Sequence, residues 1–192
     1  EKIEYIVQEE RLGFGHAVYQ CKRFVNNQPV LLALGDTLYS TKNNKNCTEQ
    51  LLEAFESTKK TTLSIHTVPL KDVVHYGMVA GKWTDSAHKL MEIDEIREKP
   101  TVEYAGKHMG IPSGDGKLRY YSVFGEYVLM PEVFYILEEN IKENRTSNGE
   151  IQLTDALETE REKSGLCGFA VDGEMFDVGI PEAYAHTVAN FK

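Results

Sequence analysis

Basic segments are scarce in this chain. Its 21 Lys and Arg residues stand against 30 Asp and Glu residues, which gives a net charge of −9 and an isoelectric point near 5.2. No run of Lys or Arg is long enough to supply the basic patch that nucleic acid or an anionic membrane surface requires. The composition therefore argues against both as partners and predicts a soluble, acidic protein.

Cysteines and long apolar runs are also few. The three cysteines, Cys21, Cys47 and Cys167, are odd in number, lie far apart and form no C-x-x-C pair. This usage suits a reducing compartment and argues against a structural zinc site. No apolar run approaches the length of a membrane span, and no charged-then-apolar leader opens the chain. We expect a cytoplasmic protein that does not enter a membrane.

Strand and helix patterns alternate along the chain. Short apolar or alternating runs predict strands over residues 3–7, 29–34, 63–68, 79–83, 89–93, 120–129, 167–171 and 175–178. Helical spacing, or a Pro suited to a first turn, predicts helices over 16–24, 47–55 and 131–144, after Thr154, and from Pro181. Residues 41–46 and 100–117 are predicted to be loops. No repeat or linker divides the 192 residues, so one α/β domain is expected.

The stretch 29–36 organises this arrangement. Five apolar residues follow Pro29 and precede Gly35 and Asp36. Such a run is typical of a central strand buried on both faces in a parallel sheet. Because ligands of open α/β sheets sit outside the carboxyl ends of the strands, Asp36 is a candidate for holding a metal ion or a sugar. An ordinary turn is the alternative reading.

A second carboxylate, Asp177, repeats this pattern at the end of the last predicted strand. Two such carboxylates on one face would make a Mg²⁺ site. Near the amino terminus, Gln8 precedes the turn sequence GFGH, whose Gly13 allows a close backbone approach to a flat ligand. A tight turn into a helix explains the same glycine without a ligand.

Four further residues place bare backbone or charge in or beside a predicted strand. Gly77, at the start of a strand, leaves room for a sugar hydroxyl to meet the backbone, although a strand bulge explains it as well, and Gly125 is another bare position within a strand. Glu98 and Lys99 place a carboxylate beside an ammonium, a pair that can bind a sugar hydroxyl and a phosphate. As a surface ion pair alone, they would contribute under about 1 kcal/mol.

The order of these motifs resembles a known family along nearly the whole chain. The motifs are Gln8, GFGHAV at 13–18, LGD at 34–36, YGMV at 76–79, EKP at 98–100, GEYVL at 125–129, GEIQLTDA at 149–156 and FDVG at 176–179. Together they resemble the bacterial UTP-glucose-1-phosphate uridylyltransferases, or UDP-glucose pyrophosphorylases, within the sugar nucleotidyltransferase family. The resemblance implies a mostly parallel, Rossmann-like (GT-A-like) nucleotidyltransferase sheet flanked by helices.

The resemblance also implies roles for individual residues. Gln8 and Gly13 match positions that contact uracil, and Asp36 and Asp177 match the pair that holds Mg²⁺. The positions of Gly77, Glu98 and Gly125 match contacts to the glucose hydroxyls, while Lys99 matches the lysine on the sugar phosphate. The implied reaction joins UTP and glucose 1-phosphate into UDP-glucose and releases pyrophosphate, with Asp36, Lys99 and Asp177 as the catalytic residues.

One family feature has no counterpart in the sequence. The family begins with a strand and an Arg-containing, Gly-rich loop that wraps the triphosphate, and this chain resembles only the portion after it. We therefore expect residues 1–192 to be the carboxyl-terminal major part of a single nucleotidyltransferase domain that lacks its first strands. Turnover by this polypeptide alone is expected to fall well below the roughly 10 per second of an ordinary enzyme.

Alternatives in other classes stay open. A thymidylyltransferase acting on the same sugar phosphate is the nearest competitor. A non-catalytic fragment that binds sugar phosphate is a second possibility, and a glycosyltransferase that also uses Asp and Mg²⁺ is a third. The family resemblance further implies a homo-oligomer, with helix 131–144 as part of the surface offered for assembly.

Overall fold

The computed structural model describes residues 2–179 and 181–191. Its helices are α1 (Phe14–Tyr19), α2 (Lys22–Val25), α3 (Cys47–Thr58), the 3₁₀ helix η1 (Leu70–His75), α4 (Val102–His108), α5 (Pro131–Lys142), α6 (Leu153–Ser164) and α7 (Pro181–Asn190). Its strands are β1 (Val30–Ala33), β2 (Thr37–Ser40), β3 (Thr62–Val68), β4 (Gly77–Trp83), β5 (Leu90–Glu98), β6 (Ile111–Pro112), β7 (Leu118–Leu129), β8 (Cys167–Ala170) and β9 (Glu174–Asp177).

The larger sheet is mixed. Its strands run in the order β1-β7-β3-β8-β5-β4, with β6 added beside β7. Among the described strands, only β3 and β8 pair in parallel, while the other pairings are antiparallel. The expectation of a mostly parallel sheet was therefore wrong. The sheet is mixed because β4 and β5 form an antiparallel hairpin, and because β7 is long enough to pair antiparallel with several strands.

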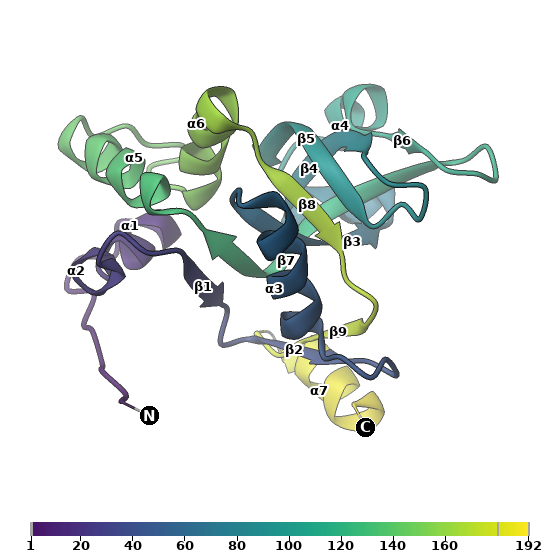
Figure 1. The fold of residues 1–192 in the computed structure, drawn as a ribbon, viewed down its shortest axis with the longest axis horizontal. Coiled ribbons are helices and arrows are strands. Elements are labelled where there is room, and N and C mark those ends of the chain that lie inside the picture. The colour runs from purple at the N-terminus through teal and green to yellow at the C-terminus, as the bar shows by residue number, and fades with distance from the viewer. Residues whose placement is uncertain (1, 180, 192) are drawn as a thin grey trace.

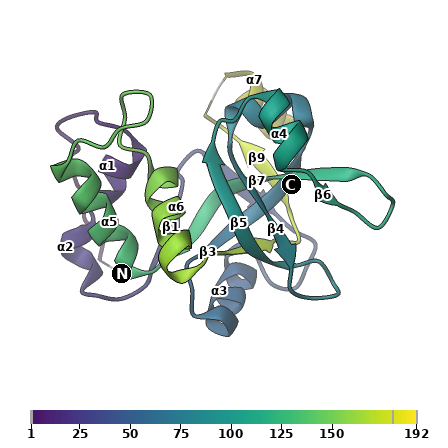
Figure 2. The ribbon, with the colours of Figure 1, turned by 90° about the horizontal axis from the view of Figure 1, so that it is seen from above.

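Helices cover both faces of this sheet (Figures 1 and 2). Along β7, Val128 packs against Leu51 and Phe55 of α3, whereas Tyr127 and Leu129 join the cluster formed with α1, α5 and α6. Alternate residues of a strand point to opposite faces, so α3 lies on one face and α1, α5 and α6 lie on the other.

Local signals explain where the long helices begin. Asn46 accepts from the amide of Glu49, whose side chain in turn accepts from the amide of Asn46, and this capping box starts α3. Pro131 stands in the first turn of α5, where its missing N–H has no intrahelical partner to lose. No described helix is both long and apolar enough to cross a membrane.

Several sequence predictions failed in instructive ways. Residues 3–7 form no strand, because an alternating pattern becomes a strand only beside a pairing partner. Their apolar side chains, Ile3, Tyr5 and Val7, are exposed. The predicted central strand is β1, an edge strand with alternating exposure, and Leu31 is 41% exposed. The helix predicted over 16–24 is split into α1 and α2, and α4 lies within the predicted loop 100–117.

A separate two-stranded sheet pairs β2 with β9 antiparallel. The sequence pattern predicts β9 as a strand but not β2. In Figure 1 this ribbon and α7 lie below the larger sheet, away from the group of α1, α2 and α5. The ribbon matters for function because it begins directly after Asp36 and ends at Asp177.

Candidate active site

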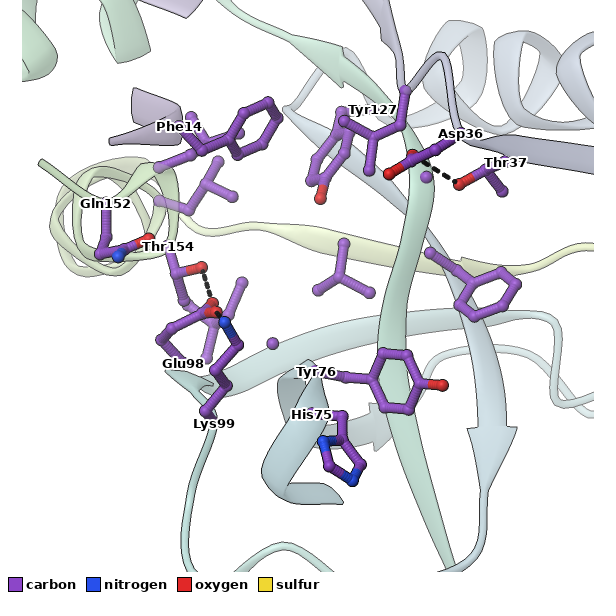
Figure 3. A pocket seen from close by; sticks show the side chains of 18 of the residues that line it. Phe14, Asp36, Thr37, His75, Tyr76, Glu98, Lys99, Tyr127, Gln152 and Thr154 are labelled. Carbon is purple, nitrogen blue, oxygen red and sulfur yellow. Dashed lines mark hydrogen bonds and ion pairs between the residues drawn. The ribbon is translucent and has the colours of Figure 1, made fainter. Parts of the chain in front are cut away.

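A cavity of about 450 Å³ opens between the β2–β9 ribbon and the start of α6. The ends of β4 and β5 and the middle of β7 complete its walls. Figure 3 shows the labelled acids on two sides of it, Asp36 on one and Glu98 on the other. The polar side chains that line it are those of Asp36, Thr37, His75, Tyr76, Glu98, Lys99, Tyr127, Glu150, Gln152, Thr154 and Asp177.

Asp36 and Asp177 lie together at one side of this cavity. In the β2–β9 ribbon, Thr37 is the partner of Asp177, and the amide of Val178 donates to the carbonyl of Asp36 at 2.8 Å. A Cβ placed on Gly179 would lie 3.1 Å from Asp36 Oδ2 and 3.2 Å from Asp177 Oδ1. The bare backbone of Gly179 therefore leaves room for both carboxylates to share one small space.

This pair suits a divalent cation that also binds a ligand. Mg²⁺ is commonly held by one or two carboxylates, with substrate phosphates and water completing its shell. Within the described residues no group of three or more His, Cys, Asp or Glu side chains is placed to hold a metal. The donor set therefore fits a cation shared with a phosphate better than a closed protein site.

Glu98 and Lys99 lie on the other side of the cavity, at the end of β5. Thr154 Oγ1 donates to Glu98 Oε2 at 2.7 Å, and Lys99 Nζ lies 3.6 Å from Glu98 Oε1. Opposite Glu98 in the β4–β5 ladder is Gly77, where an added Cβ would lie 3.2 Å from Glu98 Oε2. The absence of a side chain at Gly77 thus keeps open the space in front of this carboxylate.

Gly125 adopts a conformation that favours glycine, with φ +67°. A Cβ there would lie 2.7 Å from Thr37 Cγ2 and 2.9 Å from the hydroxyl oxygen of Tyr39. Its carbonyl accepts from the amide of Leu34 at 2.8 Å. Gly125 therefore lets the β2 segment pass close to β7, which brings Asp36 to the cavity.

Gln8 and Gly13 are not among the residues that line the cavity. The Gln8 amide nitrogen donates to the carbonyl of Gly13 at 3.2 Å and lies 3.0 Å from His16 Nδ1. Gly13, with φ +112°, packs on the segment 150–151, since an added Cβ would lie 2.8 Å from Ile151 O. Phe14, which follows Gly13, does line the cavity, so Gln8 and Gly13 lie beside one end of it.

Sequence reasoning had not singled out Tyr127, Gln152 or Thr154 as site residues. Tyr127 is buried but lines the cavity, and Figure 3 shows its hydroxyl directed inward beside Asp36. Burial raises the pKa of Tyr127, and the nearby Glu98 and Asp36 carboxylates raise it further. The hydroxyl therefore stays a proton donor at neutral pH. All three residues lie within the motifs at 125–129 and 149–156, so membership of these motifs is the sequence signal that points to them.

The chain resembles known proteins along nearly its whole length. Residues 1–191 match the family model for nucleotidyl transferases. The chain is 33% identical to UTP-glucose-1-phosphate uridylyltransferase 2 of Streptococcus pyogenes over 191 residues, which are 98% of this chain and 58% of that protein.

Solved structures show the same relationship. One crystal structure of an apo UDP-glucose pyrophosphorylase has a TM-score of 0.81 and 26% identity, covering 98% of this chain and 63% of the other. A UDP-glucose pyrophosphorylase in complex with UDP-glucose has a TM-score of 0.80 and 26% identity, covering 98% and 65%. The chain thus spans less than two thirds of each relative's length, and it belongs to the nucleotidyl transferase family.

Proposed function

We propose that this chain carries the sugar-phosphate and metal site of a UTP-glucose-1-phosphate uridylyltransferase. One observation supports this most strongly: Asp36 and Asp177 converge on one side of a single cavity, while Glu98 and Lys99 lie on the other. A nucleotide sugar requires this combination, because its diphosphate needs cations and its hexose needs hydrogen-bond acceptors and donors. The similarity to uridylyltransferases supports the same assignment.

The proposed reaction joins two anions. A phosphate oxygen of glucose 1-phosphate attacks the α-phosphorus of UTP, the bond to the β-phosphate oxygen breaks, and pyrophosphate leaves. The sugar phosphate is already ionised, so no general base is needed. Asp36 and Asp177 would hold a Mg²⁺ ion, which when bound supplies positive charge to the phosphates.

The protein's own residues position the reactants. Lys99 is exposed enough to reach a phosphate and reduces the repulsion between the two substrates. Glu98 accepts from hexose hydroxyls, which approach through the gap left by Gly77. Gly125, whose backbone lines the same cavity, is assigned to the same hexose. Holding both substrates in line converts a bimolecular encounter into a reaction within one complex.

The uracil is assigned to the end of the cavity beside Phe14. There Gln8 would contact the base edge, exchanging its hydrogen bond with His16 for one with the base, and Gly13 would allow close backbone approach. The remaining assignments, a cytoplasmic location and a homo-oligomeric state, are expectations that accompany this family assignment.

Calorimetric titration tests the proposal. The 192-residue chain is titrated with UDP-glucose in the presence and absence of MgCl₂, with dTDP-glucose as the competing ligand. We expect saturable binding at one site, strengthened by Mg²⁺ and stronger for UDP-glucose than for dTDP-glucose. Absence of binding to UDP-glucose, UTP and glucose 1-phosphate alike would overturn it.

A turnover assay separates the alternatives. Pyrophosphate release that requires both UTP and glucose 1-phosphate identifies the transferase. Binding of glucose 1-phosphate without binding of UTP identifies the non-catalytic sugar-phosphate-binding alternative. Transfer of glucose from UDP-glucose to an acceptor, with release of UDP, identifies a glycosyltransferase.

A further inference from the structure

Helix α6 lies along the edge of β5 where β8 no longer pairs with it. Strand β8 pairs with β5 only from Leu90 to Glu92. Beyond that point, the amide of Ile93 donates to the carbonyl of Leu166 at 3.0 Å, and the amide of Ile96 donates to Glu158 Oε2 at 3.1 Å. Two amides of β5 beyond β8 therefore donate to α6 and to the segment that follows it.

The Glu158 carboxylate that accepts from β5 is itself held in place. Arg161 Nε donates to Glu158 Oε2 at 2.8 Å, and Arg161 Nη2 donates to Oε1 at 2.8 Å. Such a two-point pair fixes the plane of the carboxylate. On the inner face of the helix, Leu153 and Leu157 are buried in the main core. Helix α6 is thus tied to β5 by a polar contact and anchored by apolar ones.

One turn earlier on the same helix, Thr154 reaches the end of β5. Its hydroxyl donates to Glu98 Oε2 at 2.7 Å. The Glu98 side chain is 19% exposed, and the ammonium group of Lys99 lies 3.6 Å from its other oxygen, Oε1. Without the Thr154 hydroxyl, the carboxylate would be free to turn toward Lys99 and away from the space in front of Gly77.

We propose that Thr154 is a positioning residue that acts through Glu98: its hydroxyl holds Oε2 and so presents the Glu98 carboxylate to the hydroxyl groups of the bound hexose. Helix α6, locked to β5 by Glu158 and Arg161, is the rigid element that makes this placement reproducible. The inference rests on the proposed function, since it concerns the hexose end of that same site.

The test compares two ligands in several variants. Thr154→Val keeps the shape of the side chain and removes the donor, while Thr154→Ser keeps the donor. Affinities for UDP-glucose and for UDP are measured by calorimetry. We expect Thr154→Val to weaken UDP-glucose binding by about tenfold, because the hydrogen bond between a hexose hydroxyl and the charged Glu98 carboxylate is lost. UDP has no hexose, so its binding should be unchanged. Thr154→Ser should bind UDP-glucose within about twofold of the original chain.

Matched variants separate positioning from general stability. Thr159→Val removes another hydroxyl of α6, one that donates to the carbonyl of Asp155 at 3.0 Å, and should leave both affinities unchanged. In a double-mutant cycle with Glu98→Gln, the Thr154→Val change should cost little more once Glu98 is altered, because Thr154 acts through that carboxylate. Thermal melts show whether each variant is folded.

The outcomes are distinct. If the original chain binds none of UDP-glucose, UTP and glucose 1-phosphate, the proposed function fails before any variant is made. If it binds UTP or glucose 1-phosphate but not UDP-glucose, the positioning role alone is refuted. If that chain binds UDP-glucose but Thr154→Val binds it equally well, or loses UDP to the same degree, the positioning role is refuted. Additive losses in the double-mutant cycle, with Thr154→Val folded, refute it as well. Should Thr154→Val fail to fold, a large loss in Thr154→Ser despite its retained hydroxyl would also count against it.

Discussion

Asp36 and Asp177 are neighbours because the chain pairs β2 with β9, and the carbonyl of Asp36 accepts from the amide that follows Asp177. The two acids come from opposite ends of the sequence, yet both reach the small space left by the bare backbone of Gly179. Their convergence supports the proposed cation site and leads to the first prediction.

Removing one of these carboxylates should abolish the effect of Mg²⁺. In Asp177→Asn the side chain keeps its shape and can still accept from the amide of Gly179, but the charge is lost. We expect the Mg²⁺-dependent gain in UDP-glucose affinity to fall by about tenfold or more, because a carboxylate is a far better ligand for this cation than an amide. Calorimetry with and without MgCl₂ measures it.

Asp94→Asn serves as the matched control for that change. Asp94 is exposed on β5 and pairs with Lys82 at 3.5 Å, outside the cavity. Its replacement should leave the Mg²⁺ effect intact. A full Mg²⁺ effect in Asp177→Asn would remove this acid from the proposed site.

Lys99 should contribute charge to phosphate binding. Its ammonium group is 56% exposed and its nearest acid is Glu98. In Lys99→Gln we expect affinity for glucose 1-phosphate to drop by about tenfold, and the dependence of binding on salt concentration to become shallower, because one ionic contact is lost. Lys82→Gln, a change at an exposed lysine of β4 outside the cavity, should alter neither quantity. An unchanged salt dependence in Lys99→Gln would argue against the assigned role.

Gly125 should tolerate a side chain poorly. Gly125→Ala combines a left-handed backbone with a Cβ only 2.7 Å from Thr37, so the free energy of unfolding should fall by about 2 to 4 kcal/mol. Gly116 has φ +76° but open space around it, and Gly116→Ala should cost about 1 kcal/mol for backbone conformation alone. Gly114→Ala, with neither constraint, should lie within about 0.5 kcal/mol of the original chain. Urea denaturation gives this order, and equal values for Gly125→Ala and Gly116→Ala would contradict the close contact.

A buried acid on α6 should make stability depend on pH. Glu160 is 2% exposed; Thr61 donates to its Oε1 at 2.9 Å, and its Oε2 has no hydrogen-bond partner among the described residues. Burial raises the pKa of Glu160 from 4.5 to about 7. Between these values the unfolded chain releases a proton that the folded chain keeps. The Glu160 contribution to stability is therefore complete below about pH 4.5 and is lost as the pH rises to about 7.

The variant Glu160→Gln has no carboxylate to ionise, so it avoids the cost of burying a negative charge at high pH. It keeps an acceptor for Thr61. At pH 8 its free energy of unfolding should exceed that of the original chain by up to about 3 kcal/mol, and the difference should shrink toward zero near pH 4.5. Urea denaturation across this range measures it. Glu162→Gln, at an exposed acid of the same helix, should show no such trend. Parallel pH curves for Glu160→Gln and the original chain would show that Glu160 titrates normally.

Local sequence patterns determined much of the secondary structure. The helical spacing that starts at Cys47 and the Pro at 131 predicted where α3 and α5 begin, because both signals act over neighbouring residues. The ordered series of motifs predicted the family by itself, and the match of residues 1–191 to the nucleotidyl transferase model confirms it.

The tertiary structure alone decided what the strands do. The apolar run at 30–34 is compatible with a buried central strand, yet β1 lies at a sheet edge, because pairing partners come from distant parts of the chain. The mixed sheet and the β2–β9 ribbon have the same origin. The role of Thr154 could not be predicted either, since its contact with Glu98 joins residues from separate elements. The sequence thus determined the family and most of the long helices, whereas long-range pairing assembled the site, because contacts between distant residues leave no periodic signal along the chain.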